Sequence, residues 1–248
     1  MRSIVSSNSP PPEDDRHYRK LREQYEELAS LASSLAHEIK NPLSVIRMNV
    51  ELLAEDFEEL GTPEARRALQ KIGTVNRQCV RLETLLNDFI RFNRLNQLEL
   101  KSGSLNEQII HILEFYEDQA TKQGIIIKRY LESDLPSIKM ESQTLQAALV
   151  NLVKNALEAM PDGGQLEVRT RITRNGVALD LIDTGVGMEA NTLLNMFKTF
   201  YTSKDGGSGL GLPTAKKIIE AHGGFINVQS EVGRGTWFTI EFPTPKRI

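Results

Sequence analysis

The sequence predicts an α+β protein in which a helical hairpin, dimerised into a four-helix bundle, is followed by a two-layer α/β sandwich. Three observations predict this fold class. Between residues 16 and 89, apolar residues recur at alternating steps of three and four, which is the spacing of amphipathic helices. Later segments such as 166–172 alternate apolar and polar residues, which indicates half-buried strands. Helical patterns lie between those strands, and this order favours helices packed on a mixed sheet.

The composition is that of an ordinary globular protein and excludes several functional classes. Hydrophobic residues make up 40% and charged residues 25% of the 248 residues, and the net charge is −3. This charge provides no general basic field, so we expect no nucleic acid as the main partner. The apolar runs are far shorter than the roughly 20 residues of a membrane helix, so we expect no direct membrane insertion and a cytoplasmic location. Cys79 is the only cysteine, which excludes an intramolecular disulfide and a cysteine-rich zinc site.

The first part of the chain predicts a leader and a long helix. Residues 1–15 are polar and proline-rich, and we interpret them as a flexible leader or as the boundary of a larger protein. Residues 16–100 are predicted to form the helical hairpin. The first helix has an apolar seam with heptad spacing and one skipped residue between Ile39 and Leu43. The seam consists of Leu21, Tyr25, Leu28, Ala32, Leu35, Ile39, Leu43, Ile46, Val50, Leu53, Phe57 and Leu60.

A second helix is predicted after Gly61, with Thr62 as N-cap and Pro63 at the first helical position. One hairpin would leave much of its apolar surface in water, and pairing with a second copy would bury it, so we expect a homodimer. Because Cys79 lies in the second seam, we interpret it as a core residue rather than a reactive thiol. This seam consists of Ala65, Ala68, Ile72, Val75, Cys79, Leu82, Leu86 and Phe89.

Residues 101–248 are predicted to form the sandwich, after a short hinge at 101–104. The pair Asn175 and Gly176 is a typical β-hairpin turn. The patterns predict helices at 106–123, 142–160 and 213–222, and strands at 125–131, 166–172, 177–182 and, as a pair, between 225 and 242.

A carboxylate and two glycines follow the strand that ends at Ile182. Gly185 and Gly187 allow the backbone to approach a flat ring closely. The carboxylate of Asp183 can accept a hydrogen bond from an exocyclic amino group such as that of adenine, which would discriminate against guanine. The same Asp-Thr-Gly triplet is also the signature of retroviral-type aspartic proteases, and alone it leaves both interpretations open.

A second glycine-rich segment leads into the helix predicted at 213–222. Its N–H groups and the positive helix end suit an anion such as phosphate, although a loop without a ligand is the alternative. It is not a Walker loop, because the required Gly-Lys-Ser/Thr is missing. The residues assigned to this phosphate site are Gly207, Ser208, Gly209, Leu210 and Gly211.

The residues before this segment are interpreted as a lid. Phe197 and Phe200 flank polar residues, which is typical of a mobile segment anchored by aromatic rings. From this lid, Lys204 could reach a terminal phosphate. The alternative is an ordinary surface strand.

Two asparagines on the helix at 142–160 suit a magnesium ion. Asn151 and Asn155 lie one turn apart on one face. Their side-chain oxygens fit Mg²⁺ that already has phosphate oxygens and waters as ligands, and we assign Asn155 as the metal ligand. We include Lys154 among the nucleotide-binding residues. The alternative is that both asparagines only face solvent, which the apolar residues on either side of Asn151 disfavour.

Together, Asn155 with its helix, residues 183–187, the paired phenylalanines and residues 207–211 resemble the N, G1, F and G2 boxes of sensor histidine kinases. These enzymes share an ATPase fold with gyrase, heat-shock chaperone and mismatch-repair proteins. The resemblance implies an ATP site under a flexible lid, with Asp183 on adenine, Asn155 on Mg²⁺ and Thr236 near adenine. In the ATP-hydrolysing branch a glutamate usually occupies the position of Asn151, so we do not expect hydrolysis as the main reaction.

Residues 33–43 resemble the H box of the same family. His37 lies two residues from both Leu35 and Ile39, about 200° around the helix from each, so it is predicted to point away from the seam. A neutral imidazole offers a free nitrogen, and Glu38 can hold or take the other ring proton. One alternative is a zinc-protease pair, which lacks its second histidine because residue 41 is asparagine. The other is a surface histidine without function.

Asn41 and Pro42 suggest further roles for this segment. Asn41 is one turn from His37 and could position water against a phosphohistidine, and the family uses a polar residue at this place for phosphatase activity. Pro42 frees the carbonyl of Glu38 and favours a bend, and the skipped seam residue falls at the same place. We therefore expect a soft point in the helix, where bending or rotation could switch activities.

The resemblance implies an ATP-dependent protein-histidine kinase, and the H box and residues 197–212 are most similar to the nitrogen-regulation and sporulation type. We expect His37 to be autophosphorylated and the phosphoryl group to pass to an aspartate of a response-regulator receiver domain. The alternatives are a protein-serine kinase or an ATPase on the same nucleotide-binding fold, and a dimeric scaffold without catalysis. No sensory segment precedes the helices in the sequence, so we expect the input to be separate or missing.

Overall fold

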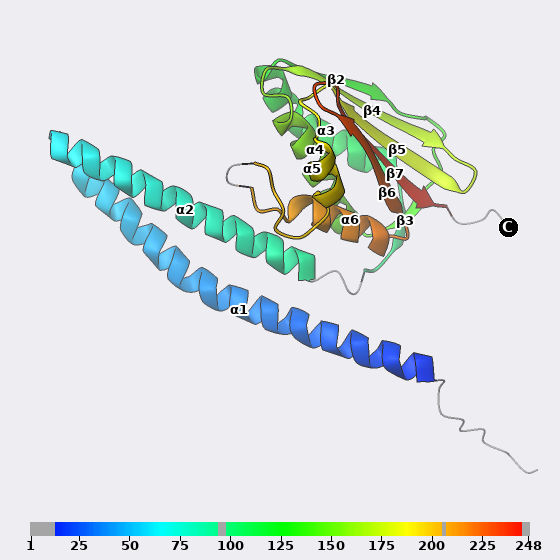
Figure 1. Cartoon of the computed structure of the whole chain (residues 1–248), viewed down its shortest axis with the longest axis horizontal. Helices are drawn as coiled ribbons and strands as arrows, with labels where there is room; N and C mark the ends of the chain where they lie inside the picture. Colours follow the sequence, from blue (N-terminus) through cyan, green and yellow to red (C-terminus); the bar gives the residue numbers. More distant parts are fainter. Residues whose placement is uncertain (1–12, 94–97, 205–206, 245–248) are drawn as a thin grey trace, which may run out of the picture.

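The structure is a computed structural model that describes residues 13–93, 98–204 and 207–244; the side chains of residues 13–33, 37 and 91–93 lie outside that description. It opens with two antiparallel helices, α1 (Glu13–Glu58) and α2 (Pro63–Asn93) (Figure 1). The first twelve residues of the predicted leader lie outside the described part of the chain. Within that part, no helix combines the length and the apolar character needed to cross a membrane.

The turn between the helices has the predicted capping residues. The backbone N–H of Ala65 donates to Thr62 Oγ1 over 3.2 Å, and Pro63 occupies the first position of α2, where its missing N–H costs nothing. In α1, Pro42 lies inside a helix that continues on both sides of it. The predicted soft point is therefore not a break, and Figure 1 shows α1 as one gently curved rod.

The apolar seam of α1 divides into two faces. Leu43, Val50 and Phe57, spaced by seven residues, are buried or half-buried within the hairpin. Ile46 and Leu53 belong to the other face and remain 49% and 47% exposed. In α2, Cys79 is only 4% exposed, as the core interpretation predicted. The hairpin therefore leaves a second apolar stripe in contact with solvent, and a helical partner could cover it.

The second unit is a sandwich of one sheet and one layer of helices. The strand order is β2-β4-β5-β7-β6, with β2 parallel to β4 and the other neighbours antiparallel. The helices α3, α4 and α6 cover one face of this sheet (Figure 1). The strands are β2 (Ile125–Tyr130), β4 (Gly164–Ile172), β5 (Gly176–Asp183), β6 (Phe225–Glu231) and β7 (Gly235–Pro243), and the helices are α3 (Leu105–Lys122), α4 (Ser142–Glu158), α5 (Ala190–Asn195) and α6 (Gly211–Ala221).

The segment predicted as a hinge is part of a small second sheet. The strand β1 (Lys101–Gly103) pairs antiparallel with β3 (Ile138–Met140), and Ser104 caps α3 by accepting a hydrogen bond from the N–H of Glu107 over 3.3 Å. The prediction of a hinge at 101–104 was therefore wrong. Three-residue strands are too short to show a periodic pattern, and the two partners are far apart in sequence.

A buried histidine fixes α4 against α6. His222 is 3% exposed; its Nδ1 lies 2.8 Å from the carbonyl oxygen of Ile218, and its Nε2 accepts the backbone N–H of Glu141 over 3.0 Å. Glu141 is the N-cap of α4, and its carboxylate accepts the N–H groups of Gln143 and Thr144. The start of α4 is thus held at the end of α6, which places the two helices side by side.

Replacing Glu141 by alanine is expected to destabilise the sandwich by about 1 kcal/mol at neutral pH, because two N–H groups lose their acceptor. Hydrogen bonds, chiefly with Thr144, lower the pKa of Glu141, although partial burial acts in the opposite direction. A lowered folded pKa means that this stabilisation exists above the unfolded pKa of about 4.3 and disappears as the pH falls through the folded value.

Urea unfolding followed by the fluorescence of Trp237, the only tryptophan, measures this effect within the sandwich. The matched control is Glu189→Ala, since Glu189 is the N-cap of α5 but makes no capping hydrogen bond. We expect a lower urea midpoint for the Glu141 variant alone at pH 7 and a smaller difference at pH 3.5. Equal midpoints for the two variants at pH 7 would contradict the role of this cap.

Candidate active site

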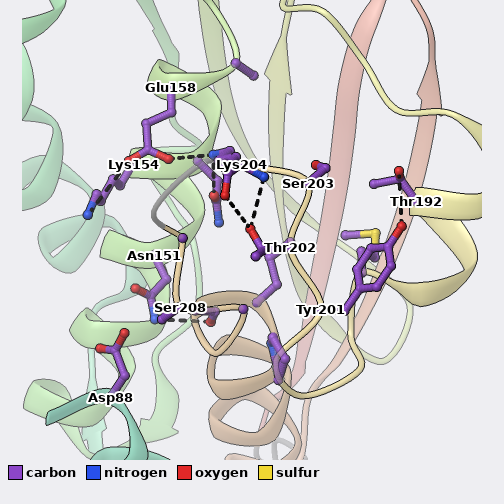
Figure 2. A pocket seen from close by; sticks show the side chains of 18 of the residues that line it. Asp88, Asn151, Lys154, Glu158, Thr192, Tyr201, Thr202, Ser203, Lys204 and Ser208 are labelled. Atoms are coloured by element: carbon purple, nitrogen blue, oxygen red, sulfur yellow. Dashed lines mark hydrogen bonds and ion pairs between the residues drawn. The ribbon is translucent and has the colours of Figure 1, made fainter. Parts of the chain in front are cut away.

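A cleft of about 1030 Å³ lies where α4, the segment before α6, the ends of β5 and β7, and the hairpin helix α2 come together. Figure 2 shows the side chains that surround it. Most of the predicted nucleotide site lines this cleft: Asn151, Lys154, Asn155, Asp183, Gly187, Lys204, Gly207, Ser208, Gly209, Gly211 and Thr236.

One end of the cleft is built around a buried carboxylate. Asp183 is 4% exposed, and its Oδ1 accepts the N–H groups of Gly185 at 2.9 Å and Thr236 at 3.1 Å. Burial raises the pKa of Asp183, and these hydrogen bonds together with the charge of Lys204 offset that effect only in part. Because both N–H groups use Oδ1, Oδ2 is left to accept from a ligand.

Gly187 and Gly209 have backbone conformations in which any other residue would be strained. Gly187 has φ +67°, and a Cβ atom there would collide with the carbonyl of Glu231. Gly209 has φ +65°, and a Cβ there would collide with the backbone of Phe200. The left-handed conformation and the lack of space both require glycine, so each one brings backbone close to the cleft.

The other end of the cleft is lined by one face of α4. Asn151, Lys154, Asn155 and Glu158 follow one another at helical spacing, and the Nδ2 of Asn151 donates to the carbonyl of Gly211 over 3.2 Å. This bond joins α4 to the first residue of α6, at the end of the glycine-rich segment. The face therefore places amide and carboxylate oxygens opposite the loop that was predicted to bind phosphate.

The lysine of the lid is bound to this face. Lys204 Nζ donates to Asn155 Oδ1 over 2.9 Å and to Glu158 Oε2 over 2.5 Å, and Figure 2 shows it reaching across the cleft toward Glu158. Lys154 Nζ lies 3.8 Å from the other oxygen of Glu158. These oxygens already hold a cationic group, so their arrangement fits a cation, and oxygen donors are what Mg²⁺ prefers.

Four of the predicted nucleotide-site residues do not line the cleft: Gly185, Phe197, Phe200 and Leu210. Phe197 packs on the core, and the ammonium of Lys216 lies 5.1 Å from the centre of its ring. Phe200 is 63% exposed with φ +64°, so it does not anchor the lid by burial as predicted. Instead, the neighbouring Tyr201 lines the cleft, and its hydroxyl donates to Thr192 over 3.4 Å.

The three residues of the predicted phosphoacceptor site lie on α1 and not in the cleft. Glu38 and Asn41 are exposed, and the side chain of His37 lies outside the described residues. An ion pair of 3.6 Å between Arg47 Nε and Glu83 Oε1 gives the local register of the hairpin. Because the helices are antiparallel, His37, about 15 Å farther from the turn than Arg47, is level with the part of α2 beyond Glu83.

The structure adds residues that the sequence patterns did not identify. Glu158 holds both lysines of the cleft, and its position one turn beyond Asn155 on the same face was the available signal. Five polar residues of α2 also line the cleft, although no spacing within α2 indicates which molecule or domain its polar face meets. They are Arg77, Gln78, Arg81, Thr84 and Asp88.

Replacing Lys204 by glutamine is expected to free the lid in the absence of nucleotide. Loss of two charge-assisted hydrogen bonds to partly exposed partners corresponds to about 1 kcal/mol, or about fivefold more opening. Chymotryptic cleavage at Phe200 and Tyr201 should accelerate by that factor. The matched control is Lys198→Gln, an exposed lysine of the same lid whose side chain makes no hydrogen bond or ion pair within the described chain. Equal cleavage rates for the two variants would contradict this lid contact.

Comparison with known families identifies the class of each unit. Residues 140–246 match the model of the histidine kinase-, DNA gyrase B- and HSP90-like ATPase, and residues 27–98 match that of the His Kinase A (phospho-acceptor) domain. The first match covers the wall of the cleft that the sandwich contributes, and the second covers the part of the hairpin that carries His37 and the α2 wall. The chain is therefore a histidine kinase catalytic core.

Individual relatives agree with this family. The chain is 31% identical to sporulation kinase E of Bacillus subtilis over 87% of its own length and 28% of the relative. It is 32% identical to sensor histidine kinase ZraS of Klebsiella oxytoca over 92% of this chain and 51% of that protein. It thus spans about half or less of these two curated relatives.

Solved structures show the same fold. Full-length ShkA in complex with AMPPNP superposes with a TM-score of 0.70 and 26% identity, covering 87% of this chain and 46% of ShkA. Histidine kinase ThkA in complex with response regulator protein TrrA superposes with a TM-score of 0.66 and 24% identity, covering 97% of this chain and 70% of ThkA.

Proposed function

We propose that this chain transfers the γ-phosphoryl group of ATP to His37 and then to an aspartate of a response regulator. The observation that carries the proposal is the shared wall between the two units: α2 of the hairpin lines the same cleft as Asp183 and Asn155. The cleft thus opens beside the hairpin that bears His37. We assign residues 16–100 to the phosphoacceptor unit and residues 101–248 to the nucleotide unit.

The transfer to histidine needs an in-line nucleophile and a place for one proton. A ring nitrogen of neutral His37 forms a bond to the γ-phosphorus, while the bond from that phosphorus to the β–γ bridging oxygen breaks and ADP leaves with the electron pair. The phosphorylated ring then loses the proton of its other nitrogen. Glu38 is the adjacent carboxylate that can take this proton.

The residues of the cleft divide the binding of ATP between them. Asp183 Oδ2 would accept from the adenine amino group, and Thr236 lies beside it. Asn155 would hold Mg²⁺, which when bound neutralises phosphate charge. Lys204, once released from Asn155, would be free to bind the phosphate chain together with the amides of residues 207–211.

The proposed transfer to a response regulator is supported by the family of the chain. The proposed homodimer is supported by the exposed apolar surface of the hairpin. ThkA, which shares the fold, forms a complex with a response regulator. The exposed stripe that includes Ile46 and Leu53 favours pairing of two hairpins. Asn41, exposed one turn after His37, would position water to remove phosphate from the regulator.

Incubation of the chain with γ-labelled ATP tests the proposal. We expect label that is lost in acid and stable in base, which is the behaviour of a phosphoramidate, and that moves to an added receiver domain. Acid-stable label would favour a protein-serine kinase, and steady release of phosphate without label would favour an ATPase. A chain that binds ATP without any label would be a scaffold.

A further inference from the structure

The wall that α2 contributes to the cleft contains Val80 and Leu85 together with a row of polar residues turned away from α1. Arg77, Arg81, Thr84 and Asp88 follow at steps of four, three and four, and so lie along one side of the helix. Cys79 is buried in the hairpin, and Arg81, two residues later, lies about 200° around the helix from it. Figure 1 shows α2 between α1 and the sandwich.

The cations that line the cleft differ in what they already bind. Lys204 and Lys154 both contact the carboxylate of Glu158. The guanidinium of Arg77 donates to Thr74 Oγ1 of its own helix over 2.9 Å. Arg81 makes no hydrogen bond or ion pair with any residue that the structure describes, and its side chain is exposed. It is therefore the cation of this wall that is free to bind an anion.

Position along the cleft indicates which part of a nucleotide Arg81 would meet. The adenine end is formed by Asp183 and Thr236 at the ends of β5 and β7. The opposite end is formed by the α4 face and Lys204. Figure 2 shows Asp88 of α2 on the same side of the cleft as the α4 residues Asn151 and Lys154. Arg81 lies on the same face of α2, two turns before Asp88. From there we expect its guanidinium to meet the phosphates rather than the base.

We propose that Arg81 binds the terminal phosphate of the ATP in the cleft, so that α2 completes the nucleotide site. The proposal rests on the function proposed above. Guanidinium groups bind phosphate oxygens through two parallel hydrogen bonds, which makes arginine well suited to this place. Thr84 has no charge, and Asp88 would repel the phosphate. ATP would then hold the sandwich against the hairpin through its third phosphate, and ADP, which lacks that phosphate, would not.

Titration calorimetry with AMPPNP and with ADP, both with Mg²⁺, tests the proposal on the full chain. For Arg81→Gln we expect AMPPNP binding to weaken by about 10- to 100-fold, as for loss of a hydrogen bond to a charged group, and ADP binding to change less than about twofold. Arg81→Lys, which keeps the charge but not the paired hydrogen bonds, should fall between the parent and the glutamine variant. The matched control is Arg66→Gln, an exposed arginine of α2 that does not line the cleft.

Three results with these variants would overturn the proposal. Unchanged AMPPNP affinity in Arg81→Gln would overturn the proposal, and so would equal weakening of AMPPNP and ADP, since Arg81 would then not distinguish the terminal phosphate. Weakening in Arg66→Gln of the same size would overturn it as well, because any lost positive charge would have the same effect. Failure of the proposed function would appear in the parent chain instead, as binding of neither nucleotide.

Discussion

Replacing His37 by glutamine should abolish the acid-labile labelling of this chain by γ-labelled ATP, with a loss of about a thousandfold or more. The amide nitrogen of glutamine shares its electron pair with the carbonyl and cannot attack phosphorus, although the side chain keeps a similar size and polarity. Nucleotide affinity should remain that of the parent, because the residues that line the cleft come from α2 and the sandwich and not from α1.

The control for this experiment is His111→Gln, an exposed histidine on α3. It removes one imidazole from the sandwich and should leave labelling intact. Acid-labile label that persists in the His37 variant would contradict the assignment of the acceptor, and label lost in both variants would point to a general effect on the cleft. Calorimetry with AMPPNP separates the second case from a loss of the nucleophile alone.

The elements with a repeating pattern could be predicted from the sequence. Heptad spacing predicted both hairpin helices, and alternation predicted the strand at 166–172, because burial on one face repeats at a fixed period in each case. The strand after it was predicted from the Asn175–Gly176 turn, since β5 is buried along nearly its whole length and does not alternate. The glycine motifs could also be recognised in the sequence, because Gly187 and Gly209 adopt backbone conformations that other residues avoid. Eleven of the predicted nucleotide-site residues consequently line one cleft.

The parts that escaped prediction depend on contacts between distant segments. The strands β1 and β3 are too short to show a period, so the segment at 101–104 was interpreted as a hinge. The contact of Lys204 with Glu158 joins residues 46 positions apart, and neither side chain indicates its partner by itself. The role of Arg81 follows from where α2 meets the sandwich, which no local spacing in α2 encodes.

Replacing Asp183 by asparagine should weaken ATP binding by about 100-fold or more without lowering the stability of the sandwich. Asp183 Oδ1 accepts the N–H groups of both Gly185 and Thr236, so an asparagine must turn its own Oδ1 to the same two donors. Its amide NH₂ then takes the place of Oδ2 and faces the adenine amino group, donor against donor. A buried site of this kind loses the attractive hydrogen bond and gains an unpaired donor.

The expected stability of the Asp183→Asn variant depends on the pKa of the carboxyl group that it replaces. Burial raises the pKa of Asp183 in the folded protein, so the carboxylate charge is a net cost at neutral pH. Stability contributed by this group is present below the unfolded pKa of about 3.9 and is lost as the pH rises through the folded value. The asparagine variant carries no such charge. Without nucleotide it should therefore unfold at the same urea concentration as the parent at pH 3.5, and at the same or a higher one at pH 7.

Asp180, three residues earlier on β5, is a control whose pKa is shifted in the opposite direction. Burial alone would raise its pKa, but hydrogen bonds from Thr239, Arg171 and Trp237 outweigh burial and lower it. Its charge therefore stabilises the fold above the unfolded pKa, and Asp180→Asn should lower the urea midpoint at pH 7 while keeping the preference for ATP over GTP. In Asp183→Asn that preference should fall or reverse, because the new NH₂ group can donate to the carbonyl oxygen of guanine. A variant of Asp183 that keeps the parent's preference for ATP would show that this carboxylate does not contact the base.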